Sequence, residues 1–448
     1  MPGWMDAEQR VQRAHDLYGK GRLVEAAAEL QAAIDVNPHN GAWLFNLGLT
    51  LEAMGDHLRA CQAYRKALAI DGDDIESLLC LGINLTRLSR YEDALECFEH
   101  VERIDPSHEP CYCHRITTYC EMGQHDKAEL MFYLARLFKD RCPDCYCNIA
   151  ASFYARGMYD HAVNCLVEAL RIDPQFPQAH ACIAEARWAQ GKLDEARSHY
   201  ESELRVGVDD TETLVDLGEL LIEMNLAEEA EHAFTKALAK ASDHAGAHFG
   251  LGQVALDSSK LSKAEMEFRL VLQTDPDYPG AHAMLARVLL RRQRFDAAAK
   301  QLLSELKMCG DDPATLQEIG RLFVESRRPG QANTVFRKLV RLNPLDAHAR
   351  HGLAVSCFLL RNLDEGIMHC RRALKLKPDY ALALYNLAVA HLHKGELTRA
   401  RRYATKALTI SPHDHRVLGL FESLRHRAVR FKLPAGLRPG RHFRTMRH

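Results

Sequence analysis

The apolar residues between Gly41 and Asp74 fall into two runs that have helical spacing. The first run is Leu44, Leu47 and Leu51, and the second is Ala60, Tyr64 and Ala67. Apolar residues three or four positions apart lie on one face of an α-helix. Met54-Gly55-Asp56 separates the runs, and a glycine at such a point favours a turn. The stretch therefore predicts a helical hairpin with one apolar face on each helix.

This hairpin pattern returns every 34 residues along the chain. With the first unit begun at Ala7, twelve consecutive units run to Asp414 without an inserted or deleted residue. One hairpin cannot bury both of its apolar faces, so it must stack on further copies. The pattern predicts an all-α solenoid that forms one elongated domain.

Small residues recur at two positions, counted from the first residue of each unit. Position 8 is small in every unit except the fourth, which has Ile116. Position 20 is small in all units: Ala26, Ala60, Ala94, Ala128, Ala162, Ala196, Ala230, Ala264, Ala298, Ala332, Gly366 and Ala400. A larger side chain between two helices would overpack the contact, at a cost of about 1–3 kcal/mol. We expect the helices of each hairpin to meet at these positions.

Proline recurs at position 32, where the second helix of a unit must end because proline cannot continue it. These residues are Pro38, Pro106, Pro174, Pro276, Pro344, Pro378 and Pro412.

The repeated pattern of W/L, L-G, Y/L, G, A, Y/F, A and P with a 34-residue period resembles the tetratricopeptide repeat. The resemblance implies a right-handed superhelical solenoid of helix-turn-helix repeats. In that family the first helix of each pair lines a concave groove that binds a peptide or a protein. The resemblance spans residues 7–414, about nine tenths of the chain.

The two ends of the chain depart from the repeat. Residues 1–6 form an amino-terminal extension, and the apolar spacing in residues 415–431 predicts a helix that caps the last unit. Residues 432–448 contain Lys432, Arg438, Arg441, Arg444 and Arg447 and no acidic residue. We expect this basic tail to be disordered and to meet an anionic partner, such as nucleic acid, a membrane surface or an acidic protein. Docking of the tail on the acidic groove section of the same chain, or a tail that is only solvated, stay open as alternatives.

Composition narrows the class of protein. The formal net charge is −2 and 26% of the residues are charged, which is typical of neither a nucleic-acid-binding nor a disordered acidic chain. We find no signal peptide and no run of 18 apolar residues, so we expect a cytoplasmic protein without a transmembrane segment. The fourteen cysteines are then expected to be reduced.

No sequence motif for catalysis is present. The chain has no phosphate-binding loop, nucleophile elbow, zinc-protease helix or dinucleotide fingerprint, and its uninterrupted phase leaves no room for an inserted catalytic domain. We therefore expect no enzyme activity, no catalytic residue and no cofactor.

Cysteines concentrate in units four and five. The residues are Cys111, Cys113, His114 and Cys120, followed by Cys142, Cys145 and Cys147. A C-x-x-C beside further Cys and His residues is typical of zinc or redox sites. Because Cys111 and Cys145 share position 3, and Cys113 and Cys147 share position 5, on helices about 8–10 Å apart, we expect no metal here. Arg115 and Ile116 also break the repeat pattern. They indicate a locally repacked unit or, as an alternative, a kink where a partner docks.

The concave positions of the resembled family point to candidate partner-binding residues. Aromatic or amide contacts would come from Phe45, Asn46, Asn148 and Tyr385, with Cys113 and His114 in the irregular fourth unit. The resemblance also implies that the Lys/Asn clamp of cochaperone repeats is missing from the first three units.

Charge divides the expected groove into two sections. Units six and seven contribute Glu185, Asp216 and Glu219, whereas units nine and ten contribute Arg287 and Arg321. Such a groove would orient an extended ligand by electrostatic complementarity, unless these charges are only a solvated face.

The sequence thus favours a non-catalytic scaffold or adaptor that binds an extended peptide or a partner protein. Two alternatives stay open: a regulatory or substrate-recruiting subunit of a separate transferase, and a cysteine-based metal or redox sensor.

Overall fold

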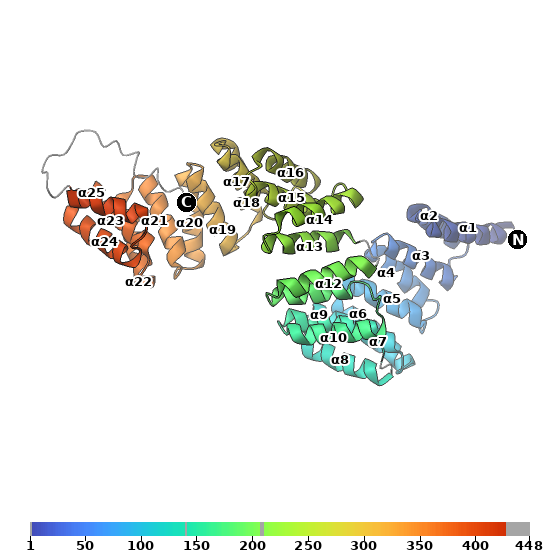
Figure 1. Cartoon of the computed structure of the whole chain (residues 1–448). Helices are drawn as coiled ribbons and strands as arrows, with labels where there is room; N and C mark the ends of the chain where they lie inside the picture. Colours follow the sequence, from blue (N-terminus) through green and yellow to red (C-terminus); the bar gives the residue numbers. More distant parts are fainter. Residues whose placement is uncertain (1, 139–140, 207–209, 427–448) are drawn as a thin grey trace. The chain divides into compact units, whose positions relative to one another are not determined.

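The fold consists of helices throughout the described part of the chain. The structure is a computed structural model, and it describes residues 2–138, 141–206 and 210–426. Within these ranges the chain forms twenty-five α-helices and no β-strand (Figure 1). Helices α1–α24 make twelve consecutive pairs, and α25 follows the last pair. The prediction of an all-α fold built from twelve helical hairpins is confirmed.

The chain divides into two compact units, residues 1–213 and 214–448. The first unit contains α1 (Pro2–Gly19), α2 (Leu23–Val36), α3 (Gly41–Ala53), α4 (His57–Leu68), α5 (Ile75–Arg87), α6 (Tyr91–Ile104), α7 (Glu109–Glu121), α8 (His125–Phe138), α9 (Pro143–Ala155), α10 (Tyr159–Ile172), α11 (Ala179–Ala189) and α12 (Leu193–Val206).

The second unit begins inside α13, and its hairpins likewise stack in chain order. Its helices are α13 (Thr211–Glu223), α14 (Ala227–Lys240), α15 (Ala245–Asp257), α16 (Leu261–Thr274), α17 (Ala281–Arg291), α18 (Phe295–Met308), α19 (Pro313–Glu325), α20 (Pro329–Leu342), α21 (Ala347–Leu359), α22 (Leu363–Leu376), α23 (Ala381–His393), α24 (Leu397–Ile410) and α25 (His415–His426). The uninterrupted repeat phase gave no sign of this division, because the period records hairpin length and not the packing between hairpins.

Polar side chains mark the start of many first helices. The Asn40 side chain accepts a hydrogen bond from the Trp43 backbone N–H at 3.2 Å, and Asp74 does the same for Ser77 at 3.2 Å. Such caps satisfy backbone donors that have no partner within the helix.

The turn inside each hairpin has one conformation in all twelve repeats. The residue at position 15 has a positive φ in every unit: Gly21, Gly55, Ser89, Gly123, Gly157, Gly191, Asn225, Ser259, Gln293, Arg327, Arg361 and Gly395. Only glycine adopts this left-handed region without steric cost. The six units that have another residue there are therefore held in the turn by the packing of their helices.

The prolines at position 32 act as expected. Each of the helices α2, α6, α10, α16, α20, α22 and α24 ends two residues before its proline.

The small residues lie where the helices of a hairpin meet. Every alanine at position 20 is at most 1% exposed, and Gly366 is also buried. A Cβ atom added to Gly218, at position 8, would lie 2.6 Å from the ring of Phe234, and one added to Gly250 would lie 2.2 Å from it. Phe234 is fully buried, so its ring fills the space that two glycines of adjacent hairpins leave. The predicted close approach is confirmed.

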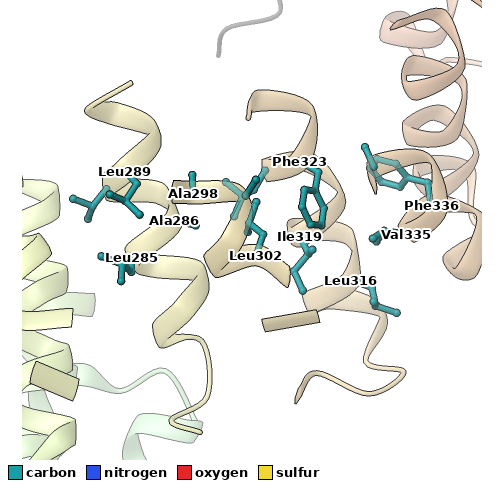
Figure 2. Close-up of a cluster of buried hydrophobic side chains, with 14 of the residues drawn as sticks. Leu285, Ala286, Leu289, Ala298, Leu302, Leu316, Ile319, Phe323, Val335 and Phe336 are labelled. Carbon is teal, nitrogen blue, oxygen red and sulfur yellow. The ribbon is translucent and has the colours of Figure 1, made fainter. Parts of the chain in front are cut away.

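Stacking joins the apolar faces into continuous cores. In the second unit one core runs from α15 to α21 and includes Leu285, Leu302, Phe323 and Phe336 (Figure 2). These side chains come from several consecutive hairpins and are at most 3% exposed, so each hairpin depends on its neighbours for burial.

The fourth repeat is repacked around a buried charge. Arg115 is 7% exposed, and its guanidinium donates to the Glu102 carboxylate at 2.6 Å. Ile116, at the usually small position 8, is fully buried. The repacked unit predicted from these two residues is therefore present.

The chain ends differ in part from the expected boundaries. Helix α1 starts at Pro2, so most of the expected extension of residues 1–6 continues the first helix. Helix α25 buries Val417 and Leu424 and is described as far as His426. The rest of the expected capping helix, to residue 431, and the basic tail of residues 432–448 lie outside the described residues. No helix in the described part is long and apolar enough to span a bilayer.

Candidate partner-binding face

The candidate partner-binding residues all lie on the first helix of a hairpin. In the first unit they are Phe45 and Asn46 on α3, Cys113 and His114 on α7, Asn148 on α9 and Glu185 on α11. In the second unit they are Asp216 and Glu219 on α13, Arg287 on α17, Arg321 on α19 and Tyr385 on α23. We call the surface formed by these helices within each unit the first-helix face.

Asparagine occupies position 6 in three repeats, as Asn46, Asn148 and Asn386. Two of these side chains are used inside the protein. The Asn148 amide donates to the carbonyl oxygen of Cys113 at 3.3 Å and to its Sγ at 3.2 Å. The Asn386 amide lies 2.8 Å from His351 Nε2. Both contacts join position 6 of one hairpin to position 5 of the hairpin before it. Asn46 is exposed, so among the three it alone is placed to hold a peptide backbone.

The basic section is neutralised within the protein. Glu318 accepts hydrogen bonds from Arg287 Nη2 and from Arg321 Nη2, each at 2.6 Å. Burial alone would raise the pKa of Glu318, but these bonds from Arg321 and Arg287 hold it below its usual value. Arg321 also pairs with Glu325. The sequence analysis missed Glu318, although it lies at position 6 of the tenth repeat and so faces the preceding hairpin.

The acidic section keeps exposed carboxylates. Glu185 and Glu219 occupy position 9 of adjacent repeats, and both side chains are exposed. Removal from bulk water nevertheless raises the pKa of each carboxyl above its usual value. Asp216 is half-buried on the same helix as Glu219.

A tyrosine missed by the sequence analysis lies near Glu185. Tyr154 belongs to α9 of the preceding repeat and is 39% exposed. Burial, and next the negative charge of Glu185, raise the pKa of Tyr154. Its ring packs edge-on against Tyr159, with 5.4 Å between centroids. Tyr154 lies at position 12 of its repeat, which is one of the positions that face the groove in the resembled family. This position could have identified Tyr154 from the sequence.

The other aromatic side chains are largely committed to internal packing. The Phe45 ring lies 5.7 Å from that of Tyr64, and Phe249 lies 5.6 Å from Phe268. Tyr385 is half-buried, and burial raises its pKa. In the fourth repeat the His114 ring stacks on Phe98 at 6.0 Å. These rings offer edges to a partner and not open faces.

The cysteines of repeats four and five are brought together more closely than their repeat positions suggest. Cys113, Cys142 and Cys145 and the carboxylate of Glu109 are buried, and their ligand atoms all lie within 4.8 Å of one another. Cys145 Sγ donates to Glu109 Oε1 at 3.0 Å. Cys113 is only 6% exposed, so its thiol is not available to a partner on the first-helix face.

Comparison with protein families agrees with the repeat geometry. The family model described as the Cilia and flagella-associated protein 70 C-terminal domain matches residues 87–274. Two models described as Tetratricopeptide repeat match residues 11–75, 318–381 and 369–415 in one case and 255–315 in the other. The chain belongs to the tetratricopeptide repeat family. Proteins with this fold are typically interaction scaffolds.

Individual relatives are distant. A stretch of 94 residues, 21% of the chain, is 28% identical to the inactive TPR repeat-containing thioredoxin TTL3 of Arabidopsis thaliana, and it covers 14% of that protein. Among solved structures, the chain is 16% identical to a chain of the APC/C hetero-tetramer Cut9–Hcn1, covering 93% of this chain and 96% of that one with a TM-score of 0.43. Yeast Tom70 is also 16% identical, with coverages of 94% and 96% and a TM-score of 0.39.

Proposed function

We propose that the protein is a non-catalytic scaffold that binds an extended basic segment of a partner protein on its first-helix face. The observation that supports this most is the charge balance of that face. Arg287 and Arg321 are engaged by Glu318, whereas Glu185 and Glu219 are exposed. A ligand would therefore meet net negative potential, which attracts lysine and arginine side chains.

The region around Glu185 fits an arginine or lysine side chain. Such a cation would pair with the Glu185 carboxylate while its stem or guanidinium packs on the exposed Tyr154 ring. Aromatic side chains next to a carboxylate commonly anchor cationic residues, because the ring face and the carboxylate both attract positive charge. We therefore place the main anchor of the partner on α9 and α11.

This proposal refines the bipolar groove predicted from sequence. The acidic section remains as a binding surface, whereas Arg287 and Arg321 are paired with carboxylates of the protein and contribute less to orienting the ligand. The interaction of the basic tail with an anionic partner, and a location in the cytoplasm, stay predictions from the sequence alone.

A peptide array tests the proposal. Extended peptides rich in lysine and arginine, and the same peptides with acidic replacements, are probed with the full-length protein at physiological salt. We expect binding to the basic set, and Glu185→Lys should weaken it about tenfold, since reversing a charge next to the ligand exchanges an attraction for a repulsion.

Two further variants sharpen the test. Glu99 is exposed on the second helix α6, so Glu99→Lys changes the net charge equally and should leave binding unchanged. Because Glu219 belongs to the second compact unit, Glu219→Lys is measured separately and reports whether that unit also contributes. Equal weakening by Glu99→Lys, or preference for the acidic peptides, would rule out this binding mode.

A further inference from the structure

Four ligand-bearing side chains converge between repeats four and five. Glu109 and Cys113 lie one turn apart on α7, and Cys142 and Cys145 lie at the start of α9. Their ligand atoms all lie within 4.8 Å of one another, and the four residues are at most 8% exposed. We propose that these residues form a structural zinc site, with Glu109, Cys113, Cys142 and Cys145 as the four ligands.

The arrangement suits a tetrahedral ion. Zinc binds cysteine sulfur at about 2.3 Å and carboxylate oxygen at about 2.0–2.2 Å, which places neighbouring ligand atoms about 3.5–3.8 Å apart. The four atoms are already grouped within 4.8 Å, so small side-chain rotations would close the shell. Each helix supplies two ligands from one face, at spacings of four and three residues.

Cysteines at equal repeat positions are too far apart to share a metal ion, and the repeat pattern therefore predicted no metal here. The structure groups residues from unequal positions. Glu109 and Cys113 are at positions 1 and 5 of repeat four, while Cys142 directly precedes repeat five and Cys145 is at its position 3. Glu109 was not predicted as a ligand, because an acidic residue in the first turn of a helix is commonly explained by its favourable interaction with the helix dipole.

Hydrogen-bond donors are directed at two of the sulfurs. The Cys145 backbone N–H donates to Cys142 Sγ at 3.4 Å, at the amino-terminal end of α9, where the helix dipole favours negative charge. The Asn148 amide donates to Cys113 Sγ at 3.2 Å. Donors of this kind fix the orientation of ligands in metal sites.

The donor set selects the ion. Three sulfurs and one carboxylate oxygen in a buried tetrahedral arrangement suit zinc, whereas magnesium and calcium require a shell of oxygens. All four ligand positions come from protein, so the site has no open position for a substrate. Binding releases the thiol protons and joins α7 to the start of α9, which makes the ion a clamp between consecutive hairpins.

Metal analysis of the full-length protein tests the site. Protein purified under reducing conditions without chelator should contain one zinc ion per chain. Cys113→Ser and Cys145→Ser should each reduce the content to near zero, and Glu109→Gln should weaken retention against a competing chelator. Cys111→Ser and Cys147→Ser are matched controls, because these cysteines share positions 3 and 5 with Cys145 and Cys113 but lie outside the cluster.

Cobalt replacement keeps the test decisive if a variant fails to fold. The wild-type protein, stripped of zinc and reduced, should take up one Co²⁺ and develop thiolate-to-cobalt charge-transfer bands with the intense visible bands of tetrahedral coordination. Reduced wild-type protein that contains no zinc and takes up no cobalt would overturn the proposal. A disulfide within the cluster in place of metal, or equal metal content in the cluster variants and the controls, would overturn it as well. None of these results depends on partner binding.

Discussion

At the residue scale, the closest packing that we describe is that of a phenylalanine ring against the Cα atoms of two glycines. Phe234 lies between Gly218 of its own hairpin and Gly250 of the next, and Phe336 lies in the same way between Gly320 and Gly352. Because the rings are buried on all sides, they cannot move away from an added methyl group. Glycine is required at these positions because a Cβ atom would clash with the ring, and not because the backbone has a conformation that only glycine adopts.

The change Gly250→Ala separates packing from helix propensity. Alanine is favoured over glycine within a helix by about 1 kcal/mol. Overpacking against Phe234, at a cost of about 1–3 kcal/mol, should outweigh this gain and lower the free energy of unfolding by up to about 2 kcal/mol. Gly419 in α25 is exposed with open space around it, so Gly419→Ala should stabilise by about 0.5–1 kcal/mol. Urea denaturation measures both, and stabilisation by Gly250→Ala would contradict the packing argument.

Much at the residue scale could be predicted from the sequence. The 34-residue period located the hairpins, the small residues and the ends of the second helices, because these features repeat in every unit. Features that occur once were not predictable. Glu318 between two arginines, Arg115 paired with Glu102 and the contact of Glu109 with Cys145 depend on rotamers and on the neighbouring hairpin, which a period does not record.

At the scale of elements, consecutive first helices are joined by polar contacts as well as by apolar packing. Helices α21 and α23 meet through His351, whose Nε2 lies 2.8 Å from the Asn386 amide and whose Nδ1 lies 3.2 Å from the Tyr380 hydroxyl. We assign Nε2 as the acceptor from Asn386, which requires a neutral ring. Burial, with a smaller contribution from His348, lowers the pKa of His351 to about 4.

This histidine predicts a pH dependence of stability. Between pH about 6.5 and about 4 the unfolded chain binds a proton at His351 and the folded chain does not, so acidification favours unfolding. The loss should be complete near pH 4 and absent above pH 7. Hydrogen exchange of α21–α23 should therefore accelerate over this range, and His351→Gln should flatten the slope.

The pH experiment needs an internal comparison, because burial also lowers the pKa values of His369 and His391 in neighbouring helices. The measured quantity is the difference in slope between the wild type and His351→Gln. His413 is exposed, so His413→Gln should keep the wild-type slope. If His351→Gln had that same slope, the His351 ring would bind protons equally in the folded and unfolded chains, contrary to the lowered pKa.

At the scale of the whole molecule, two compact units share one uninterrupted repeat phase. The free energy of unfolding of such arrays is close to the sum of the stability of each hairpin and of each interface between neighbouring hairpins. A destabilising substitution therefore acts mainly on its own hairpin and the adjacent ones.

The change Ala230→Leu tests this localisation. Ala230 is fully buried on α14, so three additional carbon atoms should cost about 1–3 kcal/mol. We expect faster hydrogen exchange in α13–α16 and a progressively smaller effect in hairpins farther from Ala230. Ala239→Leu on the exposed face of the same helix serves as the control. An equal loss of protection along the entire chain would argue against nearest-neighbour coupling.

The glycine-enclosed rings also mean that the repeats are not interchangeable. Removing residues 245–278 would delete one complete repeat and preserve the 34-residue register, yet it would bring Met284 to the place that Gly250 holds against Phe234. Even a single methyl group has no room there. Each junction is thus specific to the two repeats that form it. At the junctions of Phe234 with Gly250 and of Phe336 with Gly352, loss or exchange of a repeat would therefore require a matching change in its neighbour.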